Sequence, residues 1–61
     1  MEGIKEMVGR KVFVELNSGR KYTGVIEDID PILKLVKLLD KFNNIIYFSL
    51  TEINVLQEES R

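Results

Sequence analysis

The chain has 61 residues, a formal net charge of −1, no cysteine and no histidine. This length fits one small domain, and the missing residue types exclude disulfides and the usual structural zinc site. The balanced charge argues against duplex DNA as a partner, and no apolar run approaches the roughly 20 residues of a membrane span. The absence of cysteine fits a reducing compartment, so we expect a cytoplasmic protein. Histidine, the commonest general base, and cysteine, the best nucleophile, are both absent, so we expect no cofactor, no metal and no catalytic residues. A domain this small commonly gains stability from oligomerisation.

The N-terminal segment, residues 1–8, predicts a short helix. Ile4 and Val8 are four positions apart and share one face of such a helix, and Gly9 follows as a natural stop. Two turns of helix are marginal in isolation, so this helix needs a surface to pack on.

The next segment predicts two strands joined by the turn NSG. In the first strand, apolar and polar residues alternate, which is typical of a half-buried strand. Gly24 predicts a sharp bend or a close backbone approach inside the second strand. Ile26 and Ile29 are three positions apart, so both face inward only if a bulge lies between them, near Asp28.

The later part of the chain predicts three more strands. The segment LKLVKLL has apolar residues on both faces and follows a proline, which favours a strand over a helix. These three strands are expected at residues 33–39, 45–50 and 51–56. We therefore expect a mostly β fold in one domain, with a short helix on a strongly bent five-stranded antiparallel barrel. Its boundaries are the helix at 1–8, the barrel at 10–57 and a polar tail at 58–61, within a single domain over 1–61.

The run from residue 9 to residue 30 resembles the first motif of the Sm/LSm family. Three glycines, one aspartate and the apolar positions fall in register with that motif: Gly9, Val12, Val14, Leu16, Gly19, Tyr22, Gly24, Ile26, Ile29 and Asp30. The resemblance extends over nearly the whole chain. It implies an Sm-like (SH3-like) barrel that assembles into a homo-oligomeric ring.

The chain departs from the family where RNA is usually recognised. RNA-binding members commonly carry an aromatic residue or histidine two positions after the aspartate, and an asparagine four positions after it. Here these positions hold Ile32 and Lys34, while Ser49 and Leu50 stand where the second motif usually carries Arg-Gly. Of the usual base-recognition set, Asp30 remains. The resemblance places the segment DPILK at the pore of the ring.

The candidate RNA-binding residues are therefore Asp30, Ile32, Lys34 and Ser49. One Lys34 per subunit would place a ring of positive charge around a pore. The alternative is a solvated Asp30–Lys34 ion pair that contributes little. Ile32 is alternatively structural, because bases usually stack on aromatic rings.

The segment IIYF predicts an oligomer interface. In family rings the fourth strand pairs with the fifth strand of the next subunit, which requires apolar residues on both faces of that strand. The candidate interface residues are Ile45, Ile46, Tyr47, Phe48, Ile53 and Val55. The alternative is an ordinary core strand at a sheet edge, although such an apolar edge promotes aggregation unless it is covered.

Two functions follow from the resemblance. The first is an RNA-associated ring protein of the ribonucleoprotein type, which binds itself and, weakly at its pore, single-stranded RNA. The second is a structural or protein-interaction Sm-like scaffold that recruits a protein partner and binds no RNA. An unrelated SH3-like barrel that recognises a peptide fits the length but not the register of the three glycines.

Overall fold

The computed structural model describes residues 3–59, which form five strands and two short 3-10 helices. In chain order the elements are η1 (Gly3–Met7), β1 (Lys11–Leu16), β2 (Lys21–Asp30), β3 (Leu35–Asp40), β4 (Ile45–Ser49), η2 (Leu50–Glu52) and β5 (Ile53–Glu58). No helix in this part of the chain is long and apolar enough to cross a membrane.

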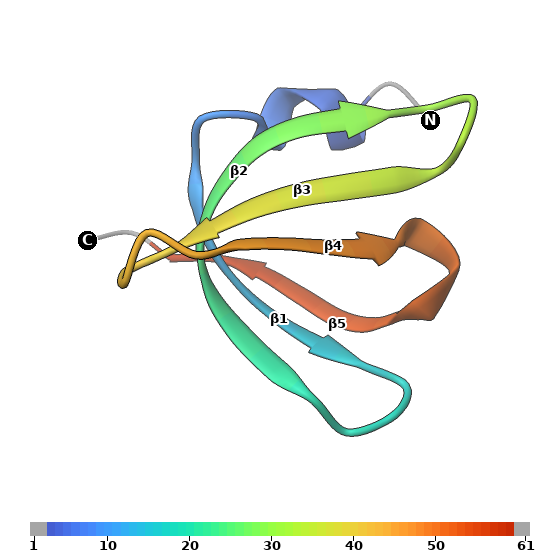
Figure 1. Cartoon of the computed structure of the whole chain (residues 1–61). Helices are drawn as coiled ribbons and strands as arrows, with labels where there is room; N and C mark the ends of the chain where they lie inside the picture. The colour runs from blue at the N-terminus through green and yellow to red at the C-terminus, as the bar shows by residue number, and fades with distance from the viewer. Residues whose placement is uncertain (1–2, 60–61) are drawn as a thin grey trace.

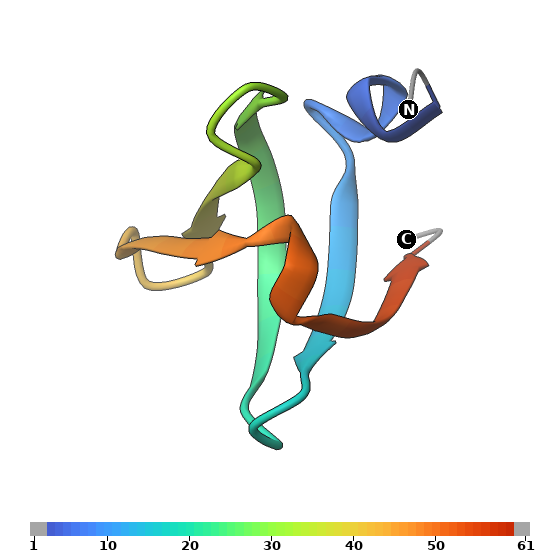
Figure 2. The ribbon, with the colours of Figure 1, turned by 90° about the vertical axis from the view of Figure 1, so that its right-hand side faces the viewer.

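The strands form one antiparallel sheet in the order β4-β3-β2-β1-β5. The sheet is strongly bent, and η2 leads from one edge strand, β4, to the other, β5 (Figures 1 and 2). Within residues 3–59 the two edges do not pair with each other, so the sheet is not closed. The predicted mostly β class is confirmed, whereas the predicted closed barrel is not.

The core lies on the inner face of the bent sheet. The alternation in β1 turns Val12, Val14 and Leu16 inward, as predicted, and each is at most 7% exposed. The other strands add Ile26, Ile29, Val36, Leu38 and Phe48. Each such side chain contributes about 1.5–3 kcal/mol when fully buried.

The close backbone approach at Gly24 and the bulge of β2 lie where the sequence predicts them. A Cβ at Gly24 would overlap the carbonyl oxygen of Leu39 on β3, so only glycine allows this close approach. The strand register shifts between Ile26 and Asp28, and Ile26 and Ile29 are therefore both buried.

The N-terminal helix expected over residues 1–8 is corrected to η1, a five-residue 3-10 helix, and residues 1–2 lie outside the described part. The chain turns at Gly9, where φ is +86°, and the N–H of Gly9 donates to the carbonyl of Ile26 at 2.7 Å. This early turn leaves room for little more than one helical turn, and a segment this short commonly forms a 3-10 helix. Met7 packs against the core.

The C-terminal half differs from the prediction at two boundaries. The strands expected at 45–50 and 51–56 are separated by η2, so β4 ends at Ser49 and β5 begins at Ile53. The last strand also extends to Glu58, one residue past the expected end of the barrel at 57.

Candidate functional site

The loop between β2 and β3 is closed by the carboxylate of Asp30. Its Oδ1 accepts hydrogen bonds from the backbone N–H groups of Ile32, at 2.9 Å, and Leu33, at 3.1 Å. Aspartate commonly starts a turn in this way, and Pro31 supplies the fixed φ that suits the second position of the turn. The Asp30 carboxylate therefore shapes the loop.

Lys34 ends this loop in a left-handed conformation, with φ of +57°. Such a conformation is unfavourable for a lysine and is more common for glycine or asparagine. The Lys34 carbonyl accepts a hydrogen bond from the N–H of Leu50 at 2.7 Å. This bond joins the β2–β3 loop to the start of η2 and leaves the exposed Lys34 side chain at their junction.

Ser49 caps η2 through a reciprocal pair of hydrogen bonds. Its hydroxyl accepts from the N–H of Thr51 at 3.1 Å, and its own N–H donates to the Glu52 carboxylate at 3.3 Å. The sequence signal for this capping box is the S-x-x-E spacing of residues 49 and 52, which the strand prediction for this region did not use. Ser49 is therefore engaged in local structure.

Three of the four candidate RNA-binding residues lie together. Asp30 pairs with Leu35 on β3, and Leu35 pairs with Ser49 on β4. Together with the hydrogen bond from Leu50 to Lys34, this register places Asp30, Lys34 and Ser49 at one end of the sheet. Positions 30 and 49 are distant in sequence, and the antiparallel pairing brings them to either side of Leu35.

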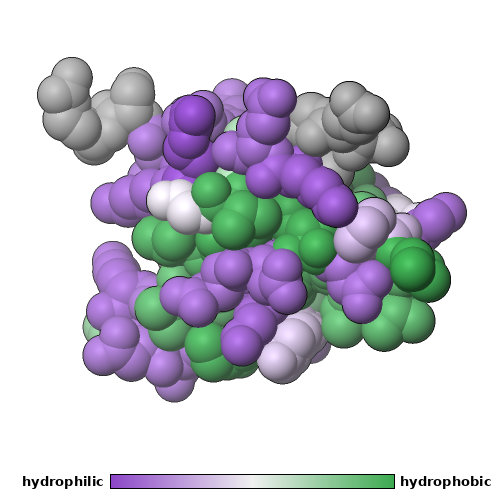
Figure 3. Space-filling model, turned by 90° about the horizontal axis from the view of Figure 1, so that it is seen from above, coloured by the Kyte–Doolittle hydropathy of each residue, from purple (hydrophilic) through white to green (hydrophobic). Residues whose placement is uncertain are grey.

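The fourth candidate, Ile32, projects away from the sheet. Its side chain is 87% exposed and that of Leu33 is 69% exposed. In Figure 3 apolar surface appears at the end of the molecule where the β2–β3 loop lies. The loop therefore presents two aliphatic side chains at its tip and no aromatic ring.

The candidate interface residues lie on both edge strands. On β4, Ile45 and Tyr47 are exposed, at 44% and 58%, and Ile46 is half-buried. Phe48 is buried, and its ring is stacked on that of Tyr22 with centroids 6.4 Å apart. On β5, Ile53 and Val55 are half-buried. The structure places these side chains along two unpaired edges, and their role in assembly stays a prediction.

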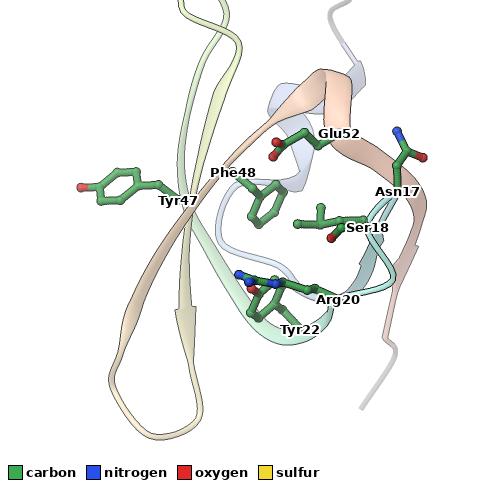
Figure 4. Close-up of a pocket in the computed structure, with 8 residues that line it drawn as sticks. Asn17, Ser18, Arg20, Tyr22, Tyr47, Phe48 and Glu52 are labelled. Atoms are coloured by element: carbon green, nitrogen blue, oxygen red, sulfur yellow. The ribbon is translucent and has the colours of Figure 1, made fainter.

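A cavity of about 390 Å³ opens between the β1–β2 turn and the segment formed by β4 and η2, and we call it the seam cavity. Its lining residues come from the end of β1, the β1–β2 turn, β2, β4 and η2: Leu16, Asn17, Ser18, Arg20, Tyr22, Tyr47, Phe48 and Glu52. Figure 4 shows Phe48 at its centre, with Arg20 beside Tyr22 on one side and Glu52 on the other. Tyr47 points to the opposite side of the ribbon. Sequence reasoning missed this site because its two charged residues are 32 positions apart.

A smaller hollow of about 230 Å³ lies on the outer face, lined by Asp28, Asp30, Leu35, Lys37 and Tyr47. In the strand register Asp28 pairs with Lys37, and Lys37 pairs with Tyr47. Two carboxylates and one ammonium group give this hollow a net negative balance, which disfavours phosphate there.

The β3–β4 turn also begins with an aspartate. Oδ1 of Asp40 accepts from the N–H groups of Phe42, at 2.9 Å, and Asn44, at 2.8 Å. These bonds, chiefly the one from Asn44, lower the pKa of Asp40 below its ordinary value, although partial desolvation opposes the shift. Phe42 is 72% exposed, with Lys41 Nζ 5.5 Å from its ring centroid.

Comparison with known proteins gives one structural similarity. The chain matches a protein chain from work on the activation of the Dcp1:Dcp2 mRNA decapping complex by Edc3 and Scd6, with a TM-score of 0.84 and 22% identity. The match covers 95% of this chain and 60% of the other, so the domain spans about three fifths of the matched chain's length. At this identity the similarity shows the fold. No family model and no curated protein matches the sequence.

Proposed function

We propose that this domain is a subunit of an Sm-like ring that binds single-stranded RNA weakly through the loops at its pore. The observation that carries the proposal is the junction of the β2–β3 loop with η2 through the Leu50–Lys34 hydrogen bond. The Sm/LSm resemblance assigns these two loops to the pore. The presence of Asp30, Lys34 and Ser49 at one end of the sheet supports contact of all three with one RNA strand.

The open sheet supports the assembly part of the proposal. β4 and β5 each have one side without a strand partner among the described residues. Unpaired edges with exposed apolar side chains, here Ile45 and Tyr47, favour pairing with another chain. Pairing of β4 with β5 of the next copy would satisfy both edges and would close a ring if the rotation between copies closes.

The chemistry of the loop favours weak and sequence-tolerant RNA binding. Lys34 supplies one positive charge per subunit toward phosphate. The Asp30 carboxylate holds the turn, and Ile32 offers an aliphatic surface in place of an aromatic platform. We therefore expect affinity from charge and shape, with little base readout.

A second candidate function is a protein-interaction scaffold that binds no RNA. The exposed side chains of Ile32 and Leu33 favour it, because two neighbouring aliphatic groups on a hydrogen-bonded turn suit an apolar pocket of a partner protein. The similar structure belongs to work on an activated protein complex that acts on mRNA, which is compatible with either function.

Titration of a labelled uridine-rich RNA at low salt tests the pore contact. Lys34→Ala should weaken binding and reduce the dependence of affinity on salt, by about 0.7 in the log–log slope for each phosphate contact that is lost. Lys41→Ala, which removes the same charge at the other end of β3, should leave both quantities nearly unchanged. No RNA binding by the wild-type chain would favour the scaffold instead.

A further inference from the structure

We propose that the seam cavity binds the base and phosphate of a guanine nucleotide. The cavity shares η2 with the proposed pore, but none of the candidate pore residues Asp30, Ile32, Lys34 and Ser49 lines it, so this inference goes beyond the proposed RNA contact and does not require a ring. It is carried by three features of the cavity: its aromatic floor, its two charged groups of opposite sign, which form no ion pair within residues 3–59, and the hydrogen bonds that fix both walls.

The floor of the cavity suits a planar ring. Phe48 is stacked on Tyr22 with an angle of 3° between the ring planes. Phe48 and Leu16 are 4% and 7% exposed, so the half-buried Tyr22 supplies most of the apolar surface that a ligand can contact. The volume of about 390 Å³ lies within the usual range for small-molecule sites, about 300–1,000 Å³. A base that enters the cavity exchanges water for contact with an aromatic surface, which is favourable for any base.

Two charged groups of opposite sign make the two sides of the cavity chemically different. Arg20 and Glu52 both line it, and the ion pairs within 4.0 Å in residues 3–59 are Arg10–Glu58 and Lys11–Glu59. Arg20 and Glu52 therefore remain separate, on either side of Phe48 in Figure 4. A ligand that is anionic at one end and donates hydrogen bonds at the other complements this arrangement.

Guanine is the base that suits a carboxylate best. A carboxylate accepts hydrogen bonds through both oxygens and donates none. Guanine places an N1–H and a 2-amino group side by side, so it offers two parallel donors to Glu52. Adenine offers one amino group beside a ring nitrogen that repels the carboxylate, and uracil offers one N–H between two carbonyl groups. The nucleotide phosphate then lies toward Arg20, whose guanidinium binds phosphate through paired N–H groups.

Both walls of the cavity are fixed before a ligand enters. The backbone N–H of Asn17, in the β1–β2 turn, donates to the carbonyl of Glu52 at 2.8 Å. The Glu52 side chain is also held by the N–H of Ser49 in the capping box. The turn that carries Arg20 and the helix that carries Glu52 are therefore linked, which lowers the ordering cost of binding.

NMR titration of the whole chain with mononucleotides tests the proposal. We expect GMP to shift the amide signals of the seam cavity and to bind roughly 5- to 100-fold more tightly than IMP, which lacks the 2-amino donor. AMP and UMP should bind more weakly than GMP, and ribose 5-phosphate should produce shifts near Arg20 alone. Equal binding of GMP and ribose 5-phosphate, or no cavity shifts at millimolar GMP, would overturn the proposal.

Substitutions of Glu52 and Arg20 test the role of each residue in binding GMP. Glu52→Gln keeps the capping box, which accepts glutamine, yet should remove the preference for GMP over IMP. Arg20→Ala should weaken GMP and IMP equally. Glu27→Gln is the matched control, since Glu27 is an exposed glutamate outside the cavity lining, and it should retain the preference. An unchanged preference in Glu52→Gln would contradict the role of the carboxylate.

A second experiment tests whether the bound guanine belongs to an RNA strand or to a free nucleotide. A short single-stranded RNA with one guanine is compared with the same strand carrying inosine, in the wild type, Glu52→Gln and Lys34→Ala. Loss of the guanine preference in Glu52→Gln with unchanged behaviour of Lys34→Ala would support the seam cavity without the pore contact. The reverse result would overturn the cavity as an RNA site and leave the pore proposal intact. Shifts by GMP without a guanine preference in RNA would identify a free nucleotide as the ligand.

Discussion

The two turns that flank β3 are built alike but are connected differently to the rest of the molecule. Each begins with an aspartate, Asp30 or Asp40, whose Oδ1 accepts two backbone N–H groups of its own turn. Each also contains a residue with positive φ: Lys34 at +57° in the first and Asn43 at +67° in the second. The same local chemistry therefore sets both turns.

The difference lies in what each turn contacts beyond itself. The first turn is joined to η2 by the hydrogen bond to the Lys34 carbonyl. Its Asp30 and the cap residue Ser49 both pair with Leu35 of β3, one on each side. The backbone hydrogen bonds of the second, from Asn43 and to Asn44, go to Asp40, so they stay within the turn. The second turn also has asparagine at its left-handed position, whereas the first has lysine at a less favourable one. A strained residue at a connected turn is a mark of function, which supports the proposed role of Lys34.

The largest effect is expected from breaking the connection of the first turn. Leu50→Pro removes the N–H that donates to Lys34, while proline suits the first position of η2, and Ser49 already has extended φ and ψ of −83° and 143°. Leu50→Ala removes only the apolar packing. We expect Leu50→Pro to lower the free energy of unfolding by about 1 kcal/mol more than Leu50→Ala does. Urea unfolding of both variants measures this, and equal stability would show that the connection contributes nothing.

The next effect concerns the left-handed residues. Lys34→Gly should raise the free energy of unfolding by about 1 kcal/mol, because glycine adopts positive φ without strain. Asn43→Gly should change it by less than about 0.5 kcal/mol, since asparagine tolerates this conformation. Thermal unfolding compares the two. A stabilised Lys34→Gly that binds RNA less well would show that stability is given up for function at the first turn, and equal effects of the two substitutions would contradict the contrast.

The smallest effect concerns acid. The pKa of Asp40 is lowered from its ordinary value of 3.8, so its ionised form stabilises the folded state at neutral pH. This contribution is present above 3.8 and is lost as the pH falls through the lower folded-state value. The stability difference between the wild type and Asp40→Asn should therefore shrink between pH 5 and about pH 2. Denaturant midpoints across this range measure it, and a constant difference would exclude the carboxylate as its cause.

Much of the sheet was predictable because it follows from local patterns. Alternation identified Val12 and Val14 as core residues, Gly24 identified the close backbone approach, and the Ile26–Ile29 spacing identified the bulge. The limits of the N-terminal helix were wrong because helical spacing does not reveal that the chain must turn early at Gly9. Strand propensity in IIYFSL also concealed the capping box that starts η2.

The candidate sites were predictable only in part. The Sm/LSm resemblance named Asp30, Lys34 and Ser49, and the strand register brings them to one end of the sheet. The seam cavity was not foreseen, because it forms where the curvature of the sheet brings the β1–β2 turn, with Arg20, to the same opening as Glu52 on η2. No local pattern encodes which turns the curvature of a sheet brings together.

Solution mass by light scattering, for the whole chain at micromolar concentration, tests the central claim most directly. One copy has a mass of 7.1 kDa. A ring predicts a single species with a mass several times this value, which takes up uridine-rich RNA at low salt and dissociates when Tyr47, on the exposed edge of β4, is replaced by aspartate. A mass of 7.1 kDa with or without RNA would contradict ring assembly and leave the protein-interaction function in its place.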